Sequence, residues 1–242
     1  MTEPATMPFT YRVRVNRRAR RARISVEAHG EVVVVLPRPL AERDIQLLVS
    51  QHQDWVCARL AELETRLAQL PGSLGLYPQT VYLEAIEQDW AVEYGVLSGQ
   101  RRWREVQNPR RIQLRAGDQE AAAREALQGW LQHQAKQILS PWLQDLAERL
   151  GLICTGVTVR AQKTRWGSCS ASGRINLNRN LLFLPPPLVE YLLVHELCHL
   201  REPNHSSRYW QQVEKVLPDY RQRDQALRAA VEQVPLWARP GA

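Results

Sequence analysis

The sequence has no long uninterrupted hydrophobic run and only four cysteines, the residues that could form disulfides. No segment approaches the roughly 20 apolar residues that a transmembrane helix needs. Residues 1–10 lack the apolar stretch of a signal peptide. We therefore expect a cytoplasmic protein with no membrane partner. The cysteines, Cys57, Cys154, Cys169 and Cys198, form no Cys-x-x-Cys pair, so neither a disulfide framework nor a cysteine-ligated zinc is expected.

The composition of the 242 residues is 44% hydrophobic, which suffices for the core of one large or two small domains. The formal net charge is +7, and all but three of the 32 basic residues are arginine. Seven arginines crowd the N-terminal region: Arg12, Arg14, Arg17, Arg18, Arg20, Arg21 and Arg23. Their alternation with Tyr11, Val13 and Val15 is typical of a strand with one solvated face. The same cluster could bind nucleic acid through its phosphates, and both interpretations stay open.

Periodicity predicts an α+β chain. We expect strands near residues 11–15, 22–28, 31–36, 157–159 and 175–178, short β-like runs over 76–115, and helices over 40–69 and 118–150. Pro71-Gly72 is expected to break the chain after the first helix. In the second helix, the expected inward residues are Ala121, Leu127, Trp130, Leu131, Ile138, Leu139, Trp142 and Leu146.

The run from His195 to His199, with glutamate at position 196, supplies two imidazoles and a carboxylate at the spacing of a metal hydrolase. On a helix, residues four apart lie on one face, so both histidines can point at one metal. With this composition, about 0.01 matches to such a pattern are expected by chance. Glu196 could then act as general base toward a water held at the open metal position.

The flanks of this motif support a buried site. Residues 188–194 form an apolar lead-in, and buried polar side chains there would be costly without a metal or hydrogen-bonding partners. Pro203 should end the helix near Glu202, and Ser206 or Ser207 should cap the next helix. The intervening turn would bring His205 back toward the first two histidines as a third ligand.

The spacing to His205 equals that of the metzincins, yet two features exclude that class. Their turn glycine is replaced here by Glu202, and they require a methionine turn downstream of the histidines. The only methionines of this chain are Met1 and Met7. The third ligand therefore belongs to another branch of the zincins.

Several segments together resemble a known family. Residues 165–170 (Arg-Trp-Gly-Ser-Cys-Ser), residues 175–178 (Ile-Asn-Leu-Asn), the histidine helix and residues 204–206 (Asn-His-Ser) are similar to the YgjP-like metallopeptidases, relatives of the WLM and SprT-like zincins. The resemblance implies that His195, His199 and His205 hold one Zn²⁺ per chain and that Glu196 is the general base. It also implies a minimal zincin-like catalytic domain, which we expect at residues 118–242. A smaller β-rich module with a helix near 40–69 would then occupy residues 1–117.

Candidate substrate contacts are less sharply defined. Asn176 and Asn178 share one face of their strand, which by analogy with zincins could be the edge that pairs with an extended peptide. A solvated sheet face explains the same pattern. Arg165 could anchor a substrate carboxylate or the oxyanion, or form a structural ion pair. Large aromatic residues near the motif, Trp166, Tyr209 and Trp210, are expected to pack around the site.

The sequence thus predicts a zinc-dependent peptidase that hydrolyses peptide bonds with a metal-bound water activated by a glutamate. Two alternatives remain: a metal-dependent hydrolase of nucleotides or other phosphorylated small molecules, and a nucleic-acid-associated protease that acts on bound proteins. A purely structural zinc is disfavoured, because such sites normally have four protein ligands. The natural substrate, the choice between endo- and exopeptidase action, and the oligomeric state do not follow from the sequence.

Overall fold

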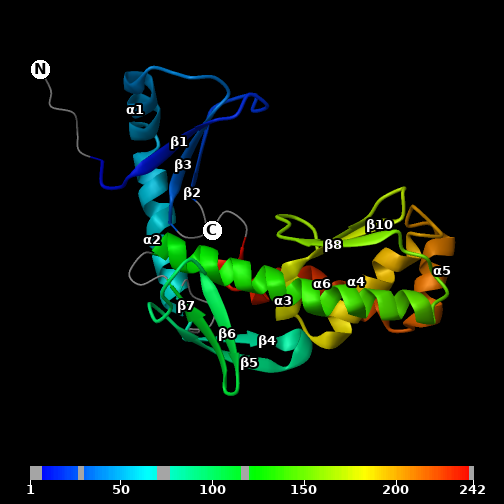
Figure 1. Cartoon of the computed structure of the whole chain (residues 1–242). Coiled ribbons are helices and arrows are strands. Elements are labelled where there is room, and N and C mark those ends of the chain that lie inside the picture. The colour runs from blue at the N-terminus through cyan, green and yellow to red at the C-terminus, as the bar shows by residue number, and fades with distance from the viewer. Residues whose placement is uncertain (1–6, 27–29, 70–76, 116–119, 240–242) are drawn as a thin grey trace, which may run out of the picture. The chain divides into compact units, whose positions relative to one another are not determined.

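The computed structural model describes residues 7–26, 30–69, 77–115 and 120–239, and Figure 1 shows its elements. Within this part of the chain the fold is α+β, with three small sheets and six α-helices. By internal contacts the chain divides into two compact units, Met1–Pro71 with Gly241–Ala242, and Gly72–Pro240. Among the described residues, no helix is both long and apolar enough to cross a membrane. The predicted break at Pro71-Gly72 lies outside the described residues.

The first unit contains a three-stranded sheet and two helices. Its elements are β1 (Tyr11–Val15), β2 (Arg23–Val26), β3 (Val32–Leu36), α1 (Glu42–Ser50) and α2 (Gln53–Gln69). Strand β3 lies in the middle, parallel to β1 and antiparallel to β2, and all five of its side chains are buried. Val34 and Leu36 pack against Ile45 and Val49 of α1. The three predicted strands are therefore confirmed.

The helix predicted over residues 40–69 is instead two helices with a short turn between them. Side chains occupy the last carbonyl groups of α1: the Ser50 hydroxyl donates to the Leu47 oxygen at 2.9 Å. The His52 ring nitrogen lies 2.9 Å from the Leu48 oxygen. Such local side-chain bonds compete with the helical hydrogen bonds, so α1 ends here and α2 begins anew.

The second unit begins with a four-stranded sheet in the order β4-β5-β7-β6. Its strands are β4 (Thr80–Leu83), β5 (Gln88–Glu93), β6 (Trp103–Gln107) and β7 (Arg110–Leu114). The short β-like runs predicted for this region are confirmed. Buried residues alternate along the strands, as at Val81 and Leu83 of β4 and at Ile112 and Leu114 of β7. One face of this sheet therefore belongs to a core.

That core is built on the long helix α3 (Glu120–Arg149) and a second small sheet. The sheet holds β8 (Gly156–Arg160), β9 (Gly167–Cys169) and β10 (Arg174–Asn178), with β10 in the middle. Most of the predicted inward residues of α3 are buried or half-buried, but Ala121 is exposed. It lies in the first turn of the helix, before the first α3 residue of the main buried cluster, Ala126.

Three helices complete the unit: α4 (Pro186–Cys198), α5 (Ser207–Val216) and α6 (Tyr220–Ala229). Short 3-10 segments accompany them: η2 (Glu84–Ile86), η3 (Arg179–Phe183), η4 (Ala230–Gln233) and η5 (Leu236–Ala238). Helix α4 is apolar nearly all round, which is typical of a helix buried in a core. It ends at Cys198, earlier than the predicted end near Glu202, because the following residues tighten into a turn with Leu200 N bonded to Leu197 O.

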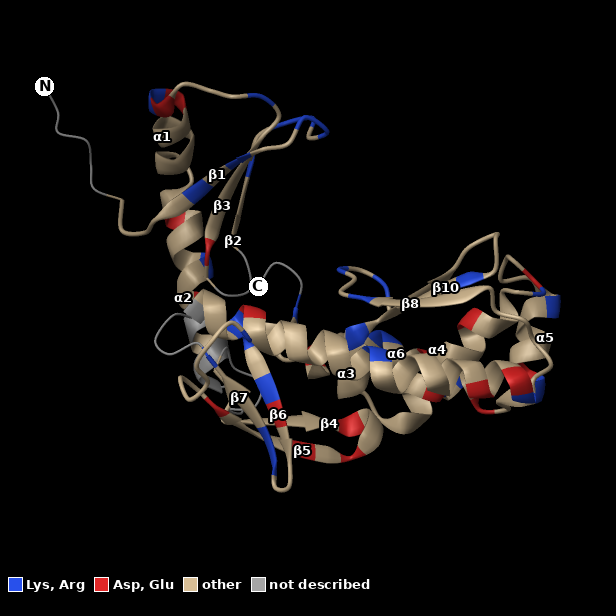
Figure 2. Ribbon diagram, in the orientation of Figure 1, with Lys and Arg blue, Asp and Glu red and all other residues tan. Residues whose placement is uncertain are grey.

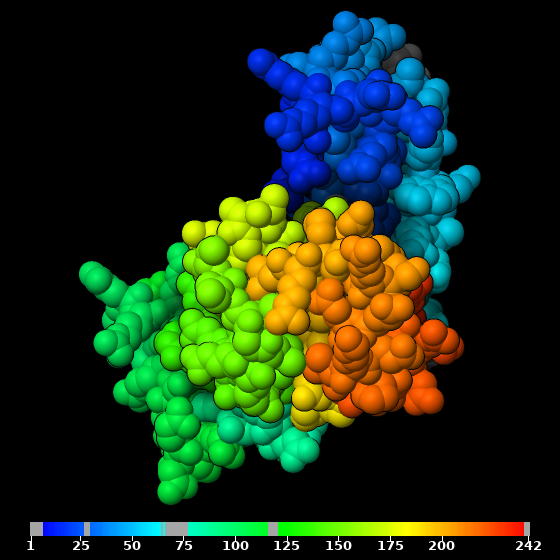
Figure 3. Space-filling view, turned by 90° about the vertical axis from the view of Figure 1, so that its right-hand side faces the viewer, coloured from blue at the N-terminus to red at the C-terminus, as the bar shows by residue number. Residues whose placement is uncertain are grey.

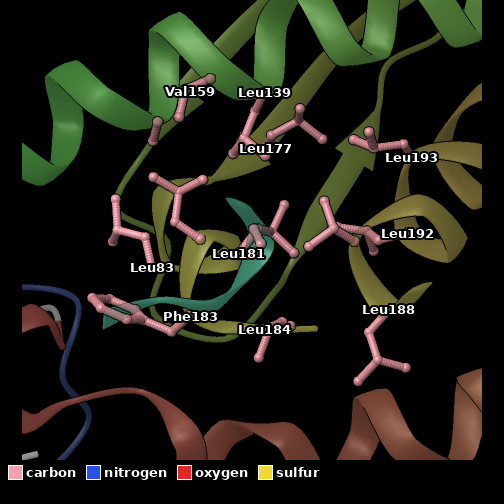
Figure 4. Close-up of a cluster of buried hydrophobic side chains, with 14 of the residues drawn as sticks. Leu83, Leu139, Val159, Leu177, Leu181, Phe183, Leu184, Leu188, Leu192 and Leu193 are labelled. Carbon is pink, nitrogen blue, oxygen red and sulfur yellow. The ribbon is translucent and has the colours of Figure 1, made fainter. Parts of the chain in front are cut away.

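Figure 4 shows the centre of this core, where side chains from β4, β8, β10, α3 and α4 lie together. Leu83 of β4, Leu139 of α3, Leu177 of β10 and Leu193 of α4 belong to the same buried cluster. The strands of residues 77–115 therefore share a core with the helix that carries the histidines. The two compact units group these strands with the histidine helix, whereas the domain boundary expected from the sequence lay at 117/118.

Candidate metal centre

The three predicted histidines lie together in the structure. His195 is in the last turn of α4, His199 is the residue that caps its C-terminal end, and His205 directly precedes the N-cap of α5. Their potential ligand atoms all lie within 4.8 Å of one another. The Nε2 atoms of His195 and His205 are 3.2 Å apart. Ring nitrogens that converge in this way are suited to share one cation.

Hydrogen bonding prepares at least one of these rings for metal binding. The Nδ1 atom of His199 lies 3.1 Å from the Glu202 carbonyl oxygen and donates to it in the neutral ring, which leaves the lone pair on Nε2. Burial, together with the neighbouring His199 and His205, lowers the pKa of His195 to about 4. Burial likewise lowers the pKa of His199. Both imidazoles are thus neutral near pH 7, the form that binds metals.

A wall of aromatic rings holds the histidines in place. The buried Tyr209 stacks on His199 with ring centroids 4.5 Å apart, and its hydroxyl donates to the His195 carbonyl oxygen at 3.0 Å. Trp210 stacks on His205 at 5.4 Å, and Tyr220 stacks on Trp210 at 5.2 Å. The sequence predicted packing around the site for Tyr209 and Trp210, but not direct contact with the ligands.

The turn between α4 and α5 brings His205 back to the other two histidines. Ser206 caps α5, its hydroxyl accepting from the Tyr209 N–H, so one of the two predicted caps is confirmed. Figure 3 shows this segment, in orange, at the surface of the second unit. Of the three histidines only His205 is exposed, and the other two are half-buried. The centre is therefore open to solvent on the side of His205.

Glu196 lies beside the histidines in a dry environment. Only 4% of its surface is exposed, and burial raises its pKa to about 8, against a smaller lowering by Arg165. Strand β9 closes over it: a Cβ atom at Gly167 would lie 2.5 Å from Glu196 Oε1. Only glycine permits this approach. Gly167 was not predicted from the sequence as a site residue, although its place within the Arg165–Ser170 segment was a signal.

The structure corrects the role considered for the asparagine strand. β10 is the central strand of its sheet, with β8 on one side and β9 on the other, so it cannot be the edge that receives a peptide. Asn178 is buried, and its amide donates to the carbonyl oxygens of Gln162 and Arg165 at 3.0 and 2.9 Å. Asn176 donates to the Ser168 hydroxyl at 3.3 Å. These contacts brace the segment around β9.

The edge strand beside Glu196 is β9, which the sequence did not predict. It pairs with β10 and also contacts α4, the helix that carries Glu196. Arg165, just before it, is exposed and lines a cavity of about 260 Å³ together with His195 and Glu196. Arg165 is thus placed where a substrate group could reach it.

The chain is similar to a known protein family and to solved structures. The sequence model of the YgjP-like family, described as a metallopeptidase domain, matches residues 20–230. The chain therefore belongs to the YgjP-like family and is a metal-dependent peptidase. Among solved structures, it is similar to the metallopeptidase zymogen of Pyrococcus abyssi abylysin, with 28% identity, a TM-score of 0.36, and coverage of 39% of this chain and 96% of that one. No curated protein matched the chain.

Proposed function

We propose that the protein is a zinc-dependent peptidase in which His195, His199 and His205 hold one Zn²⁺ and Glu196 is the general base. The observation that carries the proposal is the convergence of three imidazoles within 4.8 Å, next to a buried carboxylate. Three imidazoles suit zinc and leave a fourth position open, the pattern of catalytic rather than structural sites. The Nδ1 atom of His195 is buried and has no hydrogen-bond partner among the described residues, so a cation at its Nε2 atom would add a polar contact that fixes the ring.

When bound, zinc would lower the pKa of a coordinated water and polarise the carbonyl of the bond to be cut. Glu196 takes a proton from the attacking water and passes it to the leaving amine. Its burial favours this shuttle, since a raised pKa brings the carboxyl group close to working pH. Gly167 keeps the backbone of β9 against this carboxyl group and so holds it toward the histidines.

An extended substrate would lie along β9. In the part of the chain that the structure describes, this strand pairs only with β10, so its other edge offers backbone groups to an incoming strand. Peptide addition at this edge would place the scissile bond beside Glu196, because β9 contacts the helix that carries it. Arg165 precedes the same strand and would face the substrate.

The first test compares wild type, His205→Ala and Glu196→Gln, each purified without chelator and checked for folding by circular dichroism. We expect one zinc in wild type and none in His205→Ala. Glu196→Gln should retain zinc while casein cleavage falls by about 100-fold or more, because general base catalysis is lost. His52→Ala and Glu214→Gln, which change the same residue types elsewhere, should keep both properties. A wild type without bound metal would contradict the proposal.

We also infer a second activity, binding of nucleic acid by the first unit, from the strand register of its sheet. Arg12 and Arg14 pair with Val33 and Val35, and Arg23 also pairs with Val35, so these arginines share one face. The other arginines of the predicted cluster, Arg17, Arg18, Arg20 and Arg21, lie exposed in the β1–β2 connection. Figure 2 shows this concentration of basic residues. Guanidinium groups bind phosphates in paired hydrogen bonds.

The test of this activity is fluorescence anisotropy with a DNA duplex over a series of salt concentrations. Replacement of Arg17, Arg18, Arg20 and Arg21 by Ala should weaken binding and reduce the slope of log K against log salt by about 0.9 for each lost phosphate contact. The control replaces four exposed arginines elsewhere: Arg59, Arg115, Arg149 and Arg201. An equal loss of DNA affinity in both variants would show that binding depends only on net charge. It would contradict a binding site at the arginine cluster.

A further inference from the structure

A cavity of about 260 Å³ opens directly beside His195 and Glu196. The other residues that line it are Arg165, Trp166, Gly167, Tyr191, Leu192, Asp224, Leu227 and Arg228. They come from three parts of the second unit: the segment leading into β9, helix α4 and helix α6. The residues that would carry out the chemistry thus form one side of the cavity, and the other sides are available to hold a neighbouring part of the substrate.

The walls of the cavity are apolar and firmly packed. Tyr191, Leu192 and Leu227 are exposed by only 1%, 4% and 7%, and all three belong to the main hydrophobic core. Trp166 is half-buried and packs against the same core. Since such a core resists rearrangement, the cavity keeps its shape and discriminates among side chains by size.

Of the two carboxylates that line the cavity, Glu196 is the proposed base and Asp224 already has hydrogen-bond partners. Asp224 Oδ1 accepts from the Tyr191 hydroxyl at 2.9 Å. Its Oδ2 accepts from Arg228 at 3.0 and 2.7 Å. The remaining charged group of the lining, apart from the proposed base, is the guanidinium of Arg165. A cationic side chain would therefore meet two arginines and displace an existing ion pair, whereas an apolar side chain leaves these contacts intact.

We propose that this cavity is a specificity pocket for one large, uncharged apolar side chain, such as leucine, methionine or phenylalanine, next to the bond that is cut. This inference rests on the proposed peptidase function and adds the substrate class. The volume agrees with one side chain, because pockets for whole small-molecule ligands usually have about 300–1,000 Å³. The same size and the apolar walls disfavour a nucleotide as occupant.

The experiment first maps cleavage sites in a peptide library incubated with the zinc-loaded full chain. It then measures kcat/KM for fluorogenic peptides that differ only at the mapped position, with alanine, leucine, phenylalanine, lysine or aspartate there. Wild type should prefer leucine or phenylalanine to alanine by about 10-fold or more, the usual worth of filling an apolar pocket. Lysine and aspartate should be poor substrates.

Two changes at Leu227 alter the pocket in opposite directions. Leu227→Trp should fill it and cancel the preference for leucine over alanine, and Leu227→Ala should enlarge it and favour phenylalanine over leucine. Ala226→Leu, on an exposed neighbour in α6, is the matched control and should leave the ratios unchanged. Ratios between peptides within one variant cancel differences in folding or zinc content, so the pocket effect is read separately from overall activity.

The outcomes separate this inference from the proposed function. If wild type with bound zinc cleaves no peptide, the peptidase proposal fails and the pocket fails with it. If wild type cleaves peptides but shows no apolar preference, or a preference that both Leu227 variants leave unchanged, only the pocket is refuted. A preference for lysine that Asp224→Asn abolishes would also refute it, since Asp224 would then be the receptor of a cation.

Discussion

The sheets β1-β3-β2 and β8-β10-β9 have the same design in two separate units of the chain. In each, the last strand in sequence lies in the middle, parallel to the first strand and antiparallel to the second. The surroundings differ. The N-terminal sheet has a fully buried central strand and exposed arginines on β1. The C-terminal sheet has a three-residue edge strand, β9, against the helix of the histidines.

This comparison separates strand topology from chemistry. The same pairing pattern supports a basic surface in one unit and closes over a buried carboxyl group in the other. The two sheets differ most in the surroundings of the strand that pairs antiparallel with the central strand, β2 in one sheet and β9 in the other. β2 carries Arg23 and faces its own small core through Ile24, whereas β9 begins with Gly167 in contact with Glu196. Changes at matched positions in or beside the two sheets can therefore test which features belong to the site.

The largest effect is expected for Gly167→Ala. The new Cβ would overlap Glu196 Oε1 at 2.5 Å and Cγ at 2.8 Å, so the carboxyl group must move. We expect kcat to fall by about 100-fold or more, the worth of a positioned general base, with zinc content unchanged. Gly156→Ala on β8, whose Cβ would meet only the flexible Arg174 side chain at 3.4 Å, should keep near-normal activity. Equal losses in both variants would point to general damage to the sheet.

A smaller effect is expected for Trp210→Ala, which removes the ring stacked on His205. Because the exposed His205 would then lose a positioning contact, we expect zinc affinity to fall by about 10- to 100-fold, as for other groups that orient metal ligands. Competition with a fluorescent chelator measures this affinity directly. Trp210→Phe should restore most of it, and Trp55→Ala, at a half-exposed position on α2, should have no effect. Unchanged affinity in Trp210→Ala would show that the stack is only packing.

The smallest effects are expected from the replacement of two arginines that form ion pairs, Arg223 and Arg12. Arg223, with 19% of its side chain exposed, joins α6 to α4 through Glu190 and also pairs with Asp219, the N-cap residue of its own helix, both at 2.9 Å. Its replacement by Ala should lower the free energy of unfolding by about 1.5–3 kcal/mol. The Arg12 pair with Glu31 is 65% exposed on the arginine side, and Arg12→Ala should cost at most about 1 kcal/mol. Urea denaturation measures the free energy of unfolding of both variants. A larger loss in Arg12→Ala than in Arg223→Ala would contradict the expected order.

Much of the fold was predictable where local signals are strong. Strands β1 and β3 follow from alternating or continuous β-branched residues, and α3 follows from its long apolar period. Strand β9 was not predictable, because a Gly-Ser-Cys run of three residues has neither length nor an apolar alternation. The end of α1 was also missed, since it depends on the side chains of Ser50 and His52 turning back onto carbonyl groups.

The candidate site was predictable in its residues but not in its surroundings. His195, Glu196 and His199 lie within one helical turn, and Pro203 with Ser206 indicated the turn that returns His205. The functions of Asn176 and Asn178 were not predictable, because a strand pattern gives the face of a side chain but not whether its strand is central or at an edge. The contact of Tyr209 with His195 and His199 likewise depends on how α5 packs against α4.

The sequence by itself determined which histidines could bind a metal and how they are spaced, the glutamate that lies between two of them, and the basic character of the N-terminal strand. All of these are short-range properties, fixed by a few neighbouring residues and the geometry of a helix or strand. The tertiary structure alone decided that β9 is the edge beside Glu196, that Gly167 must be glycine, and that Leu227 and Asp224 of α6 border the site. Those relations join segments far apart in the chain, and they arise only when the shared core brings α4, α6 and the small sheet together.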